Sequence, residues 1–196
     1  MPQPSSMQNP FDRATGSLGN VVELQPMNIR VPDQIAATNF SISGLGLTRD
    51  PYLMTGTDNM WANIGISQFH LPAGAAQVVR GITALVLPDR AALLHRLHRQ
   101  RRALNGSRFA FRETETSVET TCPWGNRIRI HAPDAERFGR ITLDMPYAEF
   151  DVPPGSTPGI ARFSRKFLET PATARGGVAR ALVANGQHPV FRETDA

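Results

Sequence analysis

Two histidines stand in matching positions near the ends of apolar strands. One lies in Phe69-His70-Leu71-Pro72 and the other in Ile130-His131-Ala132-Pro133. Imidazole nitrogens are common ligands of zinc and iron, so a facing pair would predict a binding site or part of a metal site. The alternative is that both rings are hydrogen-bonded polar side chains at the edge of a sheet, without a chemical role.

Gln68 and Arg129 each precede one of these histidines by two residues. Side chains two apart on a strand point to the same face of the sheet, so each residue shares a face with its histidine. A guanidinium group is suited to a carboxylate or another anion, and Trp61 would add an apolar wall. We therefore predict a ligand-binding cleft lined by Trp61, Gln68, His70, Arg129 and His131.

A metal site would need a third protein ligand beside His70 and His131, since zinc and iron are normally held by more than two protein ligands. Glu23 is the candidate, and the metal would be iron, zinc, manganese or nickel. Nothing in the sequence requires this ligand set. The sequence thus predicts an organic ligand without a required cofactor, and keeps a divalent metal as the alternative.

Other candidate residues fit structural roles better. Glu113, Glu115 and Glu119 form a carboxylate cluster, but Glu113 and Glu115 alternate with threonines on one strand, as exposed residues do. Cys122 is the single cysteine and has no evident partner base, so we expect an inert thiol and no intramolecular disulfide. No Ser-His-Asp spacing, phosphate loop or dinucleotide motif is present.

The elements that would position these residues recur along the chain. The phrases Val31-Pro32-Asp33, Leu87-Pro88-Asp89 and Val152-Pro153-Pro154 each end a strand and precede a helical segment. Short alternating strands follow each time, and the first two units close on the His-x-Pro phrases. Such a repeat predicts one β-α-β-β-β unit present three times. The predicted fold class is α+β, with mostly antiparallel pairing in curled sheets.

We expect a disordered tail over residues 1–18, a paired two-unit domain over 19–135 and a third, unpaired unit over 140–196. The tail is polar, rich in Pro, Ser and Gly, and lacks the apolar stretch of a signal peptide. The odd number of units has two explanations. Either the chain is part of a longer four-unit protein, or the third unit pairs with its copy in a homodimer.

Composition excludes two classes of partner. The formal net charge of +4 gathers in residues 95–102, but on a helix the leucines of this region form one stripe and leave most arginines facing solvent. Aromatic residues that would stack on bases are absent from it, so we expect no nucleic-acid binding. No apolar run is long enough to span a membrane. With one cysteine, the prediction is a cytoplasmic protein.

Three features resemble the vicinal oxygen chelate superfamily of glyoxalases, extradiol dioxygenases and bleomycin-resistance proteins. They are the turn and strand Cys122-Pro123-Trp124-Gly125-Asn126-Arg127-Ile128-Arg129-Ile130, the helix over residues 159–168, and the strand–Pro-Asp–helix openings. The resemblance covers roughly residues 20–195. It implies paired βαβββ units whose sheets curl into a cleft that holds a divalent metal, and an activity of the glyoxalase or dioxygenase kind.

The same resemblance locates the metal ligands six residues before the proline of each opening phrase and four before each closing proline. This sequence has Pro26, Ile82 and Tyr147 at the first positions, and Gln68 and Arg129 at the second. Only Gln68 could ligate a metal, and Arg129 would repel one. We therefore expect binding of a small organic anion, with a metal-dependent lyase or dioxygenase and a non-catalytic dimerising module as alternatives.

A fourth unit would change where the site lies. The inward faces of the third unit carry Tyr147, Glu149, His188 and Glu193. If this chain belongs to a four-unit protein, these four residues are expected to form half of a second site.

Overall fold

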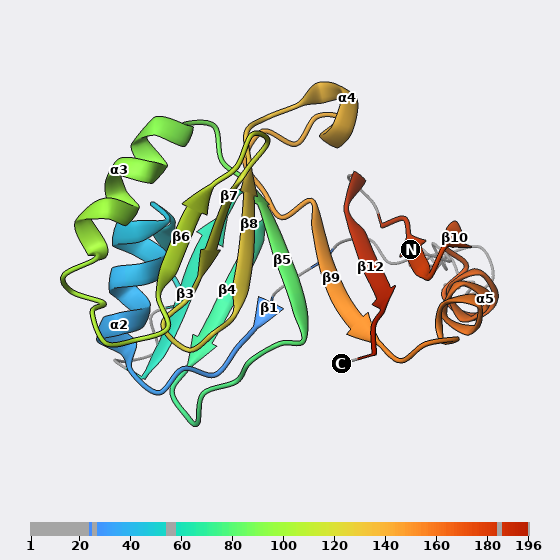
Figure 1. The fold of residues 1–196 in the computed structure, drawn as a ribbon, viewed down its shortest axis with the longest axis horizontal. Helices are drawn as coiled ribbons and strands as arrows, with labels where there is room; N and C mark the ends of the chain where they lie inside the picture. The colour runs from blue at the N-terminus through green and yellow to red at the C-terminus, as the bar shows by residue number, and fades with distance from the viewer. Residues whose placement is uncertain (1–23, 25–26, 54–57, 184–185, 196) are drawn as a thin grey trace, which may run out of the picture.

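The computed structural model describes residues 24, 27–53, 58–183 and 186–195 (Figure 1). Its elements follow the β-α-β-β-β order three times, so the predicted α+β class is confirmed. The tail predicted over 1–18 lies outside the described residues. The elements of unit one are β1 (Met27–Asn28), α2 (Gln34–Thr38), the π-helix η1 (Asn39–Gly44), β2 (Thr48–Arg49), β3 (Asn59–Ile64) and β4 (Ser67–Pro72).

The second and third units repeat this order with longer helices. Unit two contains β5 (Gly81–Val86), α3 (Arg90–Gln100), β6 (Ala110–Glu113), β7 (Val118–Thr121) and β8 (Arg127–His131). Unit three contains β9 (Tyr147–Val152), α5 (Thr157–Phe167), β10 (Ala172–Arg175), β11 (Val178–Ala181) and β12 (His188–Glu193). A short helix, α4 (Ala135–Phe138), lies between these two units.

The Pro-Asp phrases mark helix starts, as predicted. The Asp33 carboxylate accepts hydrogen bonds from two backbone amides of α2, and the Asp89 carboxylate accepts one from Ala92 at 2.8 Å. Asp134 caps α4 in the same way. These side chains satisfy amide groups that have no partner within the first helical turn. The side chain of Ser156, which precedes α5, makes no such capping hydrogen bond.

Strand order is the same in all three units, because the first strand of each pairs in parallel with the last. Unit one forms a four-stranded sheet of order β1-β4-β3-β2. Units two and three share an eight-stranded sheet of order β10-β11-β12-β9-β5-β8-β7-β6. The two halves of this sheet meet where β5 and β9 pair antiparallel, as Figure 1 shows.

The pairing of β5 with β9 corrects the expected domain arrangement. Units two and three share a sheet, whereas units one and two were expected to pair, and unit three is not unpaired. Gly81 allows the junction, since its φ is +145° and a Cβ there would lie 1.8 Å from the backbone oxygen of Glu149. The sheet therefore crosses the boundary predicted between residues 135 and 140.

Each sheet has one apolar and one polar face. In β4, Phe69 and Leu71 are buried while His70 alternates with them, and in β8 Ile128 and Ile130 are buried beside the polar alternates. The apolar faces of unit one and unit two contribute to one core with the inner faces of α2, η1 and α3. The largest buried side chains of this core include Leu45, Met60, Ile64, Leu85, Leu93 and Leu97. The polar faces of both sheets therefore point away from a shared core.

The outer surfaces bear on the predicted partners. Leu93 and Leu97 of α3 are buried, as the leucine stripe predicted, and Arg96 donates a hydrogen bond to the carbonyl of Leu45. On α5, Phe163 and Phe167 stack on each other and are exposed. A homodimer through unit three stays a prediction. None of the described helices has the length and apolar character needed to cross a membrane.

Candidate binding cleft

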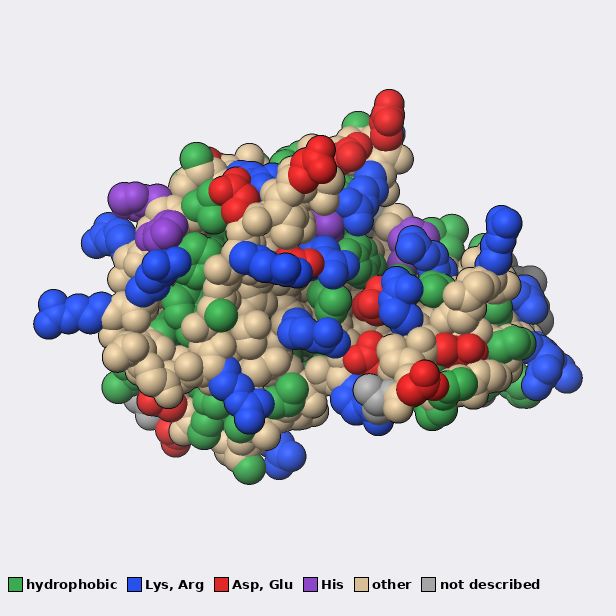
Figure 2. Space-filling model, in the orientation of Figure 1, with side chains coloured by type: hydrophobic (Ala, Val, Ile, Leu, Met, Phe, Trp, Pro, Cys, Tyr) green, Lys and Arg blue, Asp and Glu red, His purple; other side chains and the backbone are tan. Residues whose placement is uncertain are grey.

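Charged side chains from both halves of the eight-stranded sheet gather on its polar face (Figure 2). Two neighbouring hollows lie there. One, of about 380 Å³, is lined mainly by β6, β7 and β8, and the other, of about 240 Å³, lies between units two and three. Arg129 lines both, so the hollows adjoin at this residue. The polar residues of the smaller hollow are Arg129, Arg137, Tyr147, Glu149, Arg180, His188 and Arg192.

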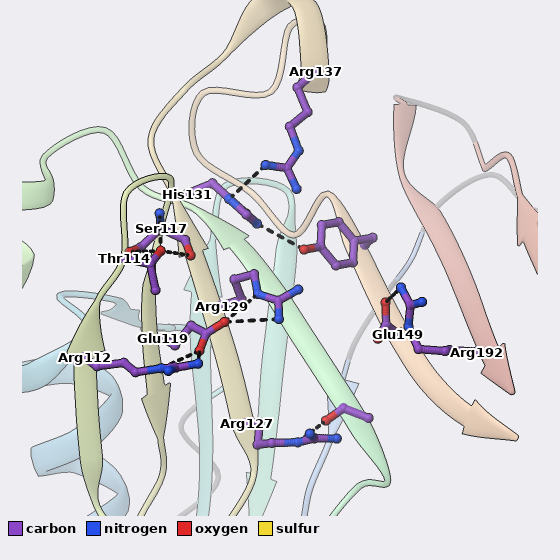
Figure 3. A network of polar contacts seen from close by, with 12 residues as sticks. Arg112, Thr114, Ser117, Glu119, Arg127, Arg129, His131, Arg137, Glu149 and Arg192 are labelled. Carbon is purple, nitrogen blue, oxygen red and sulfur yellow. Dashed lines mark hydrogen bonds and ion pairs between the residues drawn. The ribbon is translucent and has the colours of Figure 1, made fainter. Parts of the chain in front are cut away.

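Glu119 of β7 is held between two arginines (Figure 3). Its carboxylate accepts from Nε of Arg112 at 2.8 Å and from Arg129 at 3.2 Å. The hydrogen bond from Arg112 holds the pKa of Glu119 below its usual value, with a smaller contribution from Arg129, and burial opposes both. Glu119 is therefore ionised at neutral pH and offsets part of the positive charge on this face.

Arg129 lies between Glu119 and Tyr147. Burial pulls the pKa of Arg129 down, but its interactions with the Tyr147 hydroxyl and the Glu119 carboxylate raise that pKa above its usual value overall. A guanidinium is a permanent cation in proteins in any case. Arg129 thus stands as a fixed, oriented positive group at the place where the two hollows meet.

His131 connects Tyr147 to Arg137 (Figure 3). Its Nε2 lies 3.1 Å from the Tyr147 hydroxyl, and its Nδ1 lies 3.4 Å from the guanidinium of Arg137. Because a guanidinium only donates, we assign the hydrogen to Nε2, which then donates to the Tyr147 oxygen. Burial, together with the charge of Arg137, lowers the pKa of His131 to about 4. The ring is therefore neutral at pH 7 and leaves the Tyr147 hydrogen free to point into the hollow.

Glu149 and Arg192 form a two-point ion pair across β9 and β12. Nε and a terminal nitrogen of Arg192 donate to the two carboxylate oxygens at 2.9 and 3.1 Å. Glu149 is buried, and its hydrogen bond raises the pKa of Arg192 against a smaller opposing effect of burial. This pair fixes the floor of the smaller hollow on the side of unit three.

Arg137 and Arg180 lack such a partner. Both line the smaller hollow, and both are exposed. Among the residues that the structure describes, no carboxylate lies within 4.0 Å of either guanidinium. Within the described part of the chain, no ion pair therefore compensates the positive charges of these two arginines.

The structure divides the five predicted site residues between two sheets. Arg129 and His131 lie on the polar face of β8, as predicted. Trp61, Gln68 and His70 lie on β3 and β4 of unit one, where the Trp61 and His70 rings stack at 3.9 Å between centroids. Since both polar faces point away from the shared core, the two histidines do not face each other. The expected geometry of one cleft between units one and two is wrong.

His70 and Gln68 are hydrogen-bonded within unit one. Nε2 of His70 lies 2.5 Å from Oδ1 of Asn59, and burial lowers the pKa of His70. The Gln68 amide donates to Asp50 at 3.0 Å and to Asn63 at 2.7 Å. These contacts fit the alternative interpretation of hydrogen-bonded polar side chains on a sheet.

The cleft residues do not fit a divalent metal. At the positions that the family resemblance points to, Ile82 has no donor atom, Arg129 is a cation and Tyr147 hydrogen-bonds to His131. Glu23 lies outside the described residues. Within the described ranges, no group of three or more His, Cys, Asp or Glu side chains could hold a metal ion.

Sequence reasoning missed Arg137, Arg180 and Arg192, because it placed the cleft between the wrong units. Its half-site in unit three was closer, since Tyr147, Glu149 and His188 line the smaller hollow. These residues lie opposite unit two, whereas the prediction had a fourth unit complete the site. The fourth member of that set, Glu193, accepts hydrogen bonds from the backbone amide and hydroxyl of Thr157 at 2.8 and 2.7 Å, and so caps α5.

Comparison with solved structures identifies the fold. A candidate dioxygenase from Bacillus subtilis superposes with a TM-score of 0.57 at 16% identity, over 88% of this chain and 64% of the other. Glyoxalase I from Zea mays superposes with a TM-score of 0.57 at 12% identity, over 87% and 66%, and a variant of it reaches 0.59. The chain thus spans about two thirds of the length of these proteins.

The chain has the vicinal oxygen chelate fold, as the sequence predicted. At these identities the likeness concerns the fold alone. A scan of family models finds no match, and a comparison with curated proteins finds none either.

Proposed function

We propose that this protein binds a small organic anion in the cleft between units two and three. One observation carries the proposal: four guanidinium groups line a hollow of about 240 Å³ in which Glu149 is the single carboxylate among the described residues. Charge-assisted hydrogen bonds to guanidinium groups are the strong ones in protein recognition. Phe138, Pro146 and Val190 line the same hollow and offer apolar surface to a carbon skeleton.

The neutral side chains support the same ligand class. His131 is neutral at pH 7, and its neighbour Tyr147 has a hydroxyl hydrogen available for an acceptor atom. Burial also lowers the pKa of His188, with the charge of Arg180 adding to it and a hydrogen bond to the Ala181 carbonyl opposing. The hollow therefore combines fixed cations with neutral hydrogen-bonding groups, as recognition of a polar anion requires.

Isothermal titration of the full chain against small carboxylates, phosphate esters and the uncharged amides of the same acids tests this function. We expect at least one anion to bind and its amide not to bind. Arg129→Gln should weaken that binding about tenfold or more, since it removes one charge-assisted contact. The matched control is Arg162→Gln, an exposed arginine on α5 outside the hollow. If no anion binds, the proposal is wrong.

A further inference from the structure

We propose that the ligand of this cleft is a small aliphatic dicarboxylate, whose two carboxylates are held by Arg137 and Arg180. This inference rests on the proposed function and specifies the class of anion. Its basis is the distribution of compensated and uncompensated charge around the 240 Å³ hollow.

Two of the four arginines already have a carboxylate. Arg192 makes its two-point pair with Glu149 at 2.9 and 3.1 Å, and Arg129 donates to Glu119 at 3.2 Å. The remaining two, Arg137 and Arg180, have no carboxylate of the described chain within 4.0 Å. A ligand that neutralises the hollow therefore carries about two negative charges.

The two uncompensated arginines stand on different parts of the fold. Arg137 belongs to α4, which follows unit two, and Arg180 belongs to β11 of unit three. Groups from separate elements favour two separate anionic ends over one doubly charged group. A dicarboxylate offers such ends, and each carboxylate has the planar geometry that a guanidinium fork binds at two points.

The space available limits the length of the ligand. Since a water molecule occupies about 30 Å³ of liquid, the hollow of about 240 Å³ has room for roughly eight non-hydrogen atoms. Succinate has eight such atoms and glutarate nine. Tyr147, whose oxygen accepts from His131, can donate its own hydrogen to one carboxylate of such a molecule.

The test compares acids of matched length by isothermal titration at low salt. Succinate and glutarate are each paired with their monocarboxylates, butyrate and valerate, and glycerol phosphate represents a single dianionic group. We expect a dicarboxylate to bind at least tenfold more tightly than its monocarboxylate. Arg137→Gln and Arg180→Gln should each reduce that ratio to about one, whereas Arg162→Gln should leave it unchanged.

Arg180→Lys is the control for a folding defect at this position. It keeps the charge and should retain much of the preference for dicarboxylates over monocarboxylates. Circular dichroism and the unfolding midpoint of each variant confirm that it is folded. Equal affinity for mono- and dicarboxylates overturns the inference but leaves the proposed function standing. Tighter binding of glycerol phosphate than of either dicarboxylate overturns it as well, and so does an unchanged ratio in both Gln variants. Absence of binding by any anion overturns the inference and the proposed function together.

Discussion

Protonation of His131 should destabilise the protein between about pH 6.5 and pH 4. Burial lowers the pKa of this histidine to about 4, from 6.5 in the unfolded chain, so the unfolded state binds the proton more readily. The contribution of neutral His131 to the free energy of unfolding is therefore fully present above pH 7 and is lost as the pH falls through this window. The linkage relation gives a loss of about 2 kcal/mol at pH 5 and about 3 kcal/mol below pH 4.

The measurement is the free energy of urea unfolding at pH 7 and pH 5, for the wild type and for His131→Gln. The variant gives up the ring contacts with Phe138 and Tyr147, so it should be less stable at pH 7. Between the two pH values it should lose about 2 kcal/mol less than the wild type, because it has no ring to protonate. The control is His95→Gln, which replaces an exposed ring on α3 outside the cleft.

A ring-proton NMR titration reports the same protonation directly. We expect the His131 midpoint near pH 4. A midpoint near 6.5, or equal pH dependence in His131→Gln and the wild type, would refute the reasoning and with it the assignment of His131 as a neutral partner of Tyr147.

Three substitutions test the fold that positions the cleft, each by urea unfolding. Gly81→Ala should lower the free energy of unfolding by at least about 3 kcal/mol, since its Cβ would lie 1.8 Å from a backbone oxygen of β9. The control, Gly155→Ala, has open space around it and should cost about 1 kcal/mol. Equal costs would contradict the β5–β9 junction. Asp144→Ala should cost about 2 kcal/mol, because the buried carboxylate accepts from the Ser67 amide at 3.1 Å, and a neutral effect would show that this contact is dispensable. Asp89→Ala should cost about 1 kcal/mol through loss of the α3 cap, and a change below a few tenths would argue against that cap.

Local signals in the sequence predicted the units well, because they act over a few residues. Asp89 begins a helix and Gly65 turns between β3 and β4, at φ +61°. β9 ends at Val152, where the phrase Val152-Pro153-Pro154 predicted the end of a strand. Alternation placed Arg129 on the polar face of its strand correctly, since it depends only on side-chain direction.

Pairing between units could not be predicted in the same way. A first strand such as β5 has a free edge that accepts the corresponding strand of any other unit, and nothing local in its sequence distinguishes β1 from β9 as partner. The discriminating feature is Gly81, whose missing side chain lets the backbone of Glu149 approach. That signal becomes readable only once the two strands are placed together, so Arg137 and Arg180 could not be assigned to the cleft in advance.

The polar faces of the two sheets share a strand order within each unit but carry different side chains. On the unit-one face the Trp61 and His70 rings stack on each other, and His70 also hydrogen-bonds to Asn59. Gln68 on the same face donates to Asp50 and Asn63. Its strand β1 lies at a sheet edge, whereas the equivalent strands β5 and β9 pair and bring a second unit beside the first. Only the paired face combines arginines from two units around a hollow. Affinity for an anion is therefore expected from these particular residues, since the same fold with neutral side chains offers no comparable charge.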